Sequence, residues 1–185
     1  MLYALLVSVR VFASPGWSRA SPEAEKQFRA DVAKVSSDAA AAWDEGHVAL
    51  DADRLADAEA AFRKAISLAP DVDHPHRELC RVLAAANRLD DAVHECELAM
   101  SLAPASGYDK AALAKALLAR GHGDDRPRAV TLAHEAAAAL PDDAYAAEVD
   151  CVARALRQDV EDVSACVDHL LALAPDNLAD RKSVV

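Results

Sequence analysis

A 34-residue internal repeat is the feature that most constrains how this chain can fold. The segment ISLAP at 66–70 recurs as MSLAP at 100–104, and AAALP at 137–141 recurs as LALAP at 171–175, in each case at a shift of 34. The middle interval, from Pro104 to Pro141, is 37, and we place the three extra residues in the glycine-rich turn at 121–125. A period of this length is typical of a chain built from stacked, similar units.

Each repeat is expected to contain two helices. Apolar residues make up 53% of the chain and aromatic residues only 4%, so alanine and leucine must do most of the packing, which favours an all-α fold. In the second half of the first repeat, Ala58, Phe62 and Ala65 recur at intervals of 4 and 3, which predicts an apolar stripe on one face of a helix. Pro70 lies just beyond this stripe, where proline ends a helix.

The segment with Trp43, Gly46, Ala58, Phe62 and Pro70 resembles a tetratricopeptide repeat. That resemblance implies an all-α, right-handed α-solenoid of about four helix-turn-helix units with a preceding N-terminal helix. It covers about three-quarters of the chain, and we place the units at 39–72, 73–106, 107–143 and 144–177, followed by a C-terminal tail at 178–185.

The units match the family's pattern unequally. The resemblance implies that the small residue Gly46 faces Ala58, and that Cys80, Ala114 and Cys151 take the place of Gly46 in later units. The fourth unit departs most, because it has Asp150 and Arg154 where leucine-like residues are usual.

The segment at 21–38 is expected to form a helix that caps the first unit. Ser21 is a good capping residue and Pro22 is suited to a first helical turn. Phe28, Val32 and Val35 fall on one face, which should pack on the first repeat. The sequence leaves open whether this helix breaks at 36–37 or continues to Trp43.

The segment at 1–20 is apolar and has features of an export signal. Small residues at 11–13 and 18–20 provide two candidate cleavage sites, although no Lys or Arg precedes the apolar run. The alternative is a capping helix or an apolar tail, and the segment is too short to span a bilayer. Export predicts a periplasmic or secreted protein, and the alternative location is cytoplasmic.

Four cysteines fall into two pairs within repeats. Cys80 and Cys96 lie in the second unit at a spacing of 16, and Cys151 and Cys166 lie in the fourth at a spacing of 15. Each pair has one member on each helix of its unit, near the expected close contact, so two disulfides are predicted. The alternative is that these cysteines are free and serve as small apolar packing residues.

Nothing in the sequence predicts an enzyme or a cofactor. The net charge of −11 argues against nucleic acid as a partner. Phosphate loops, nucleophile elbows and dinucleotide fingerprints do not occur. Asp71, Asp73, His74 and His76 form a polar cluster that we interpret as a turn, because side chains two apart on a helix diverge, and no metal site is predicted.

The resemblance instead implies a binding groove for a protein or peptide. In this family the first helices of successive units line a concave wall, and carrying that over gives a groove with His74, Ala111 and Glu148 beside the main candidates Trp43, His47, Arg77, Arg81, Tyr108, Lys115 and Tyr145. The three cations stand out in an acidic chain, which predicts a partner with an acidic segment.

Two further expectations concern the kind of partner. The family's clamp for chaperone tails is absent, because its positions hold Trp43, His47, Glu78, Tyr108 and Ala112. The alternative to a peptide-binding adaptor is a structural protein that self-associates through its open ends.

Overall fold

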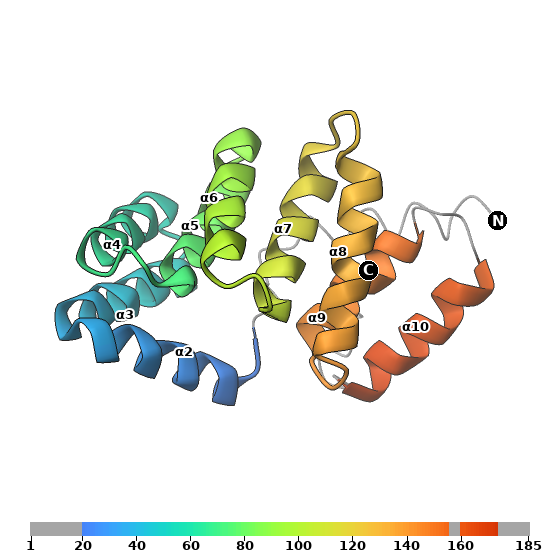
Figure 1. Ribbon diagram of the computed structural model, residues 1–185, viewed down its shortest axis with the longest axis horizontal. Helices are drawn as coiled ribbons and strands as arrows, with labels where there is room; N and C mark the ends of the chain where they lie inside the picture. Colours follow the sequence, from blue (N-terminus) through green and yellow to red (C-terminus); the bar gives the residue numbers. More distant parts are fainter. Residues whose placement is uncertain (1–19, 156–159, 174–185) are drawn as a thin grey trace.

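The computed structural model describes residues 20–155 and 160–173, which form α-helices and no strand (Figure 1). The all-α prediction is therefore confirmed. The helices are α2 (Pro22–Val35), α3 (Ser37–Asp51), α4 (Leu55–Leu68), α5 (Asp73–Ala85), α6 (Leu89–Leu102), α7 (Gly107–Arg120), α8 (Asp125–Ala139), α9 (Ala144–Ala155) and α10 (Val160–Leu173).

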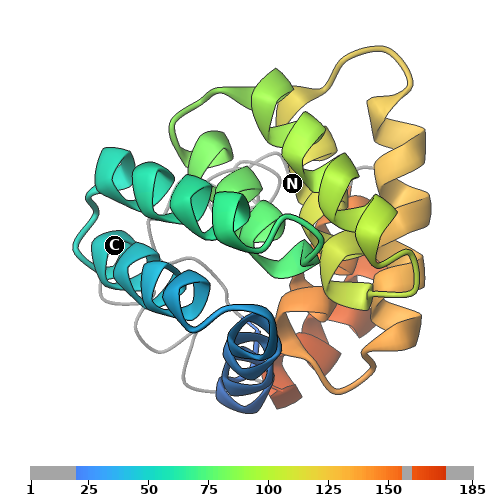
Figure 2. The ribbon, with the colours of Figure 1, turned by 60° about the vertical axis from the view of Figure 1, so that its left-hand side comes forward.

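The helices from α3 onward form four hairpins that stack side by side. The pairs are α3–α4, α5–α6, α7–α8 and α9–α10, and the second helix of each hairpin packs against the first helix of the next. The first helices α5, α7 and α9 also contact one another in sequence, so they line the inner side of the stack. Figures 1 and 2 show this arrangement, which is an α-solenoid.

The turns inside the first three hairpins share one backbone feature. Asp53, Asn87 and Gly121 recur at the period of the repeat and have left-handed backbone, with φ of 56°, 58° and 66°. Aspartate, asparagine and glycine are the residues that adopt this conformation most readily. The repeat therefore includes the backbone geometry that reverses the chain.

The sequence had suggested that the three extra residues of the third unit all lie in its turn. In the structure they do not. The turn at 121–124 is one residue longer than the turn at 86–88. Helix α7 has 14 residues against 13 in α5, and α8 has 15 against 14 in α6. The three additional residues are thus shared by both helices and the turn.

Close contacts inside the hairpins explain the small residues. A Cβ atom on Gly46 would lie 2.6 Å from the ring of Phe62, so Phe62 is the nearest side chain to Gly46 across the hairpin. In the second hairpin the same two positions hold Cys80 and Cys96, which are paired with their Cα atoms 5.4 Å apart. Cys151 and Cys166 are paired likewise, at 5.5 Å. Both predicted cysteine pairs lie at disulfide distance.

Helix α2 ends before α3 begins, which settles the question left open by the sequence. Ser36 has extended backbone, with φ −154° and ψ 124°, and its hydroxyl accepts a hydrogen bond from the Ala39 amide at the start of α3. Phe28 and Val32 are buried as predicted. The prediction for Val35 is wrong, because it is 60% exposed at the end of the helix.

Some predictions concern residues that the structure does not describe. The apolar segment with its export signal and the C-terminal tail lie almost entirely outside the described residues. Among the helices of the described ranges, none is long and apolar enough to cross a membrane.

Candidate functional site

The candidate site is the inner wall, which we define as three rows of side chains at equivalent positions of α3, α5, α7 and α9. Their spacing follows that of the repeat, with the longer interval between α7 and α9. The rows are Ala40, His74, Tyr108 and Tyr145; Trp43, Arg77, Ala111 and Glu148; and His47, Arg81, Lys115 and Val152. All seven main groove candidates belong to these rows.

Trp43 packs into its own hairpin. It is 2% exposed, and its ring centroid lies 4.6 Å from that of His47 and 5.8 Å from that of Phe62. His47 in turn lies edge-on to Phe62, at 5.4 Å. These rings form part of the core of the first hairpin, so little of Trp43 is available to a partner in this conformation.

The other end of the inner wall carries a buried tyrosine and a partly exposed lysine. Tyr145 is 4% exposed, and burial raises the pKa of its hydroxyl far above the usual range. Lys115 Nζ lies 5.5 Å from the Tyr145 ring centroid and 3.8 Å from Glu148 Oε1. The lysine is the most accessible of the three cations predicted for the groove.

Arg77 and Arg81 belong to a buried ionic cluster, which we define as Asp73, Arg77, Glu78, Arg81 and Asp109. Arg77 Nη1 donates to Asp109 Oδ1 at 3.0 Å and lies 3.5 Å from Asp73 Oδ2. Arg81 Nη1 donates to Glu78 Oε2 at 2.7 Å. Arg77 therefore links α5 to α7. The positive charge of both arginines is largely neutralised by carboxylates of the chain itself.

Burial and charge act against each other on the carboxyl groups of this cluster. Burial favours the protonated form of Glu78, but the charges of Arg81, His47 and Arg77 outweigh it and lower the pKa to about 2. For Asp73, burial is likewise outweighed by the hydrogen bond and charge of His74, and the pKa is lowered to about 2.

Asp109 behaves in the opposite way. Burial raises its pKa to about 6 despite the charge of Arg77, and the neighbouring Asp73 adds to the rise. Because the folded chain holds this proton more tightly than the unfolded chain, the stability that it contributes is lost as the pH rises through about 6.

Helix α2 lies across the inner wall of the second and third hairpins. The Phe28 ring centroid is 4.5 Å from that of His74 and 5.0 Å from that of Tyr108. The guanidinium carbon of Arg77 is 4.3 Å from the same Phe28 centroid. α2 therefore reaches beyond the first unit, on which the sequence had placed it as a cap.

Sequence reasoning missed Asp109 and the role of Phe28. Asp109 is in the first turn of α7, and its amide donates to Ser106 Oγ, so in the sequence it looks like an ordinary helix-start residue. Its partner Arg77 belongs to the preceding repeat, and local spacing does not reveal such a contact.

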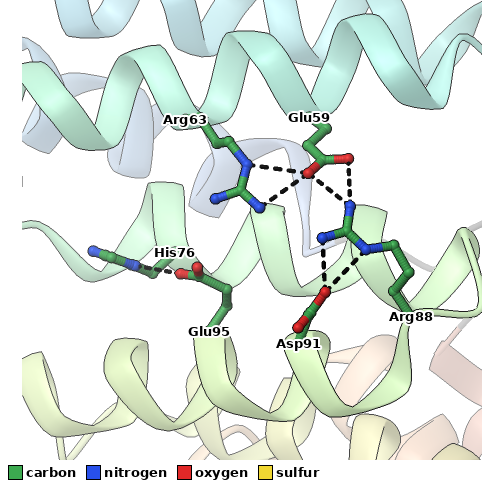
Figure 3. A network of polar contacts seen from close by, with 6 residues as sticks. All are labelled: Glu59, Arg63, His76, Arg88, Asp91 and Glu95. Atoms are coloured by element: carbon green, nitrogen blue, oxygen red, sulfur yellow. Dashed lines mark hydrogen bonds and ion pairs between the residues drawn. The ribbon is translucent and has the colours of Figure 1, made fainter.

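The outer side of the stack is joined by a separate, exposed network of ion pairs (Figure 3). Glu59 of α4 accepts hydrogen bonds from Arg63 of the same helix and from Arg88, which precedes α6. Arg88 also donates to Asp91 at 2.7 Å. These contacts connect the first two hairpins. The charged side chains of the network are paired with one another, so they do not indicate a ligand site.

The histidines near the start of α5 do not converge. His74 Nδ1 lies 2.8 Å from Asp73, whereas His76 Nδ1 lies 2.8 Å from Glu95 of α6 (Figure 3). Within the part of the chain that the structure describes, no three His, Cys, Asp or Glu side chains are grouped to hold a metal ion.

Comparison with known proteins identifies the fold. No protein-family model matches the sequence, and no curated protein matches it. Among solved structures, TTC0263, a tetratricopeptide-repeat protein of Thermus thermophilus, is similar with a TM-score of 0.63 and 18% identity, over 69% of this chain and 70% of that one. The chain has the tetratricopeptide-repeat fold.

Two further structures support that statement. YrrB, described as a tetratricopeptide-repeat protein with an unusual peptide-binding site, has a TM-score of 0.58 and 18% identity over 88% of this chain and 87% of its own. MamA from Desulfovibrio magneticus RS-1 has a TM-score of 0.60 and 14% identity over 76% of this chain and 77% of its own. At these identities the comparison establishes the tetratricopeptide-repeat fold and leaves the function to be argued from the inner wall.

Proposed function

We propose that this tetratricopeptide-repeat chain is a non-enzymatic scaffold that binds a segment of another protein on its inner wall. The observation that carries the proposal is the composition of that wall. It gathers Arg77, Arg81, Lys115 and the two tyrosines Tyr108 and Tyr145 in a chain of net charge −11, with Lys115 the accessible cation and both arginines buried in this conformation. Cations beside aromatic rings suit a partner with acidic and apolar side chains.

Two kinds of support come from the rest of the molecule. The repeat fold supplies an inner surface on which side chains of successive units face one segment. The similar structure YrrB is described as having a peptide-binding site, which agrees with such a role.

We further propose that the protein lies in an oxidising compartment, periplasmic or extracellular, because both pairs of cysteines lie at disulfide distance.

The test is site-specific photo-crosslinking in cells of the source organism. A photoreactive lysine analogue that keeps the amine replaces Lys115 on the inner wall in one variant and Lys64 in another. Lys64 is the matched control, because it is a lysine on the far end of the stack, paired with Glu45 at 3.5 Å. The proposal expects partners that crosslink from position 115 and not from position 64. The same products from both positions, or none from position 115, would contradict it.

A self-associating structural protein is the second candidate. The observation in its favour is Val48, which is 62% exposed beside Ala49, Ala60 and Ala61 in a shallow depression at the free end of the first hairpin. Sedimentation velocity of the wild type and of Val48→Asp distinguishes the candidates. An assembly that the substitution dissolves supports self-association, and a monomer at every concentration excludes it.

A further inference from the structure

Helix α2 is attached to the inner wall by few contacts. It buries two residues, Phe28 and Val32, whereas α3, which is one residue longer, buries seven. It also packs along α3, and Ala24 is partly buried there, but its other side-chain contacts are polar. Arg29 pairs with Asp44 in an exposed ion pair, at 2.6 Å. Exposed ion pairs contribute little to stability, so α2 is held mainly by Phe28 and Val32.

The acidic residues of α2 match the wall beneath them. Glu25 Oε2 lies 3.9 Å from His47 Nε2, and Asp31 Oδ2 lies 3.8 Å from His74 Nε2. These acids stand three residues before and three residues after Phe28, so all three side chains share one face of the helix. The wall therefore already holds an amphipathic helix that presents one aromatic ring between two carboxylates.

The contact beneath Phe28 is incomplete. Arg77 is 3% exposed, and its Nη2 has no hydrogen-bond partner among the residues that the structure describes. The Phe28 ring lies over the guanidinium group, with its centroid 4.3 Å from Cζ, and offers no acceptor to that nitrogen. An unpaired donor of a buried cation is costly. An occupant with a carboxylate at this point would remove that cost.

The join between α2 and α3 permits α2 to leave. Ser36 is extended, and its own hydroxyl caps the start of α3 through the Ala39 amide at 3.1 Å. The hydroxyl serves α3 alone, whereas the Ser36 amide donates to the Val32 carbonyl at the end of α2. Departure of α2 therefore does not require α3 to unwind.

We propose that α2 occupies the binding site for the partner, and that the partner is an acidic amphipathic helix that displaces it. This inference rests on the proposed function and names the chemistry of its ligand. The partner helix places an aromatic side chain between His74 and Tyr108, acidic side chains opposite His47 and His74, and a carboxylate on Arg77. In this view Arg77 and His74 recognise the ligand, and α2 covers both until it arrives.

The experiment uses the full chain and, as the probe, a fluorescent peptide with the sequence of residues 20–36. Binding is measured by fluorescence anisotropy for the wild type and for Phe28→Ala, which weakens the hold of α2. We expect the variant to bind the peptide about tenfold more tightly, because the wild type must first release its own helix. Val35→Ala is the matched control, since it trims an exposed apolar side chain of α2, and should bind like the wild type.

A second variant protects the test if Phe28→Ala disturbs the fold. Val32→Ala trims the other buried side chain of α2 by two methyl groups, and should also raise peptide affinity. A peptide with Glu25→Gln and Asp31→Asn should bind several-fold more weakly. Equal peptide affinity of the wild type and both folded variants would overturn the proposal. Sedimentation at twice the monomer mass, with α2 exchanged between copies, would also overturn it, by assigning the site to a second copy.

This test can fail independently of the proposed function. If position 115 captures the same partners in equal amounts from the wild type and Phe28→Ala, the scaffold role stands and displacement of α2 is excluded. If the peptide binds the loosened variant but position 115 captures nothing in cells, the site binds helices and the scaffold role is excluded.

Discussion

The second and fourth hairpins share a frame but differ in how they join their neighbours. Each has one pair of cysteines between its helices, and each packs its first helix against the preceding hairpin. In α5, Leu79 and Leu83 are both fully buried. The equivalent positions of α9 hold Asp150 and Arg154.

That difference shows that equivalent helices of the repeat can lie in the same place and still pack on the preceding hairpin with different strength. Asp150 is buried and accepts a hydrogen bond from Arg154 at 2.7 Å, so an ion pair stands where α5 has two leucines. Removing charges from water offsets much of their attraction. α5 keeps its charges on the inner wall, whereas α9 has two further charges in the junction, and we expect the fourth hairpin to be held more weakly.

Replacement of an arginine should affect the two hairpins very differently, and this is the largest expected effect. Arg77→Met removes a buried cation and leaves Asp73, Glu78 and Asp109 without it, which should lower the free energy of unfolding by about 3–5 kcal/mol. Arg154→Met removes a side chain that is 28% exposed and leaves one buried carboxylate, Asp150, without its hydrogen bond, so it should cost less, about 1–2 kcal/mol. Urea denaturation followed by circular dichroism measures both, and equal losses would contradict the comparison.

Loss of a cysteine pair should affect both hairpins alike. In the chain-entropy view, closing a loop of about 15 residues contributes about 3 kcal/mol. Cys80→Ala with Cys96→Ala, and Cys151→Ala with Cys166→Ala, should therefore lower the free energy of unfolding by similar amounts. A thiol count on the native protein provides the control. Four free thiols would show that neither pair is bonded in its compartment.

Conversion of the fourth junction to the chemistry of the second should strengthen it. Asp150→Leu combined with Arg154→Leu replaces the ion pair with the residue type found in α5. We expect a gain of about 1–2 kcal/mol in the free energy of unfolding, because the desolvation cost of two charges is removed. Hydrogen exchange of α9 amides measures this locally. Faster exchange in the double variant would show that the ion pair is the stronger junction.

The exposed network on the outer side should matter least. Glu59→Gln weakens the contacts from Arg63 and Arg88 that join the first two hairpins. Because these side chains are solvated, the expected loss is below about 1 kcal/mol and should shrink as salt is added. Thermal unfolding at low and high salt tests this, and a large salt-independent loss would indicate that the network is a structural requirement.

The sequence predicted the stack well because its signals are local. The 34-residue period, the proline stops and the paired cysteines each depend on neighbours within one unit or on the same position in the next. The exposure of the wall was harder to predict, because it depends on contacts between units. Arg77 has its partner on α7, and Phe28 reaches it from α2. Neither contact leaves a pattern in the local sequence, so Arg77 was identified as a wall residue but its burial was not.

The two positions that hold Gly46 and Phe62 in the first hairpin hold Cys80 and Cys96 in the second, and this difference has a mechanical consequence. The first and third hairpins contain no cysteine, whereas the second and fourth each carry a cysteine pair. Hairpins with and without a cysteine pair therefore alternate along the stack. Where the pairs are bonded, every second hairpin has a covalent link between its two helices, so reduction would remove that link from the second and fourth hairpins and leave the first and third unchanged.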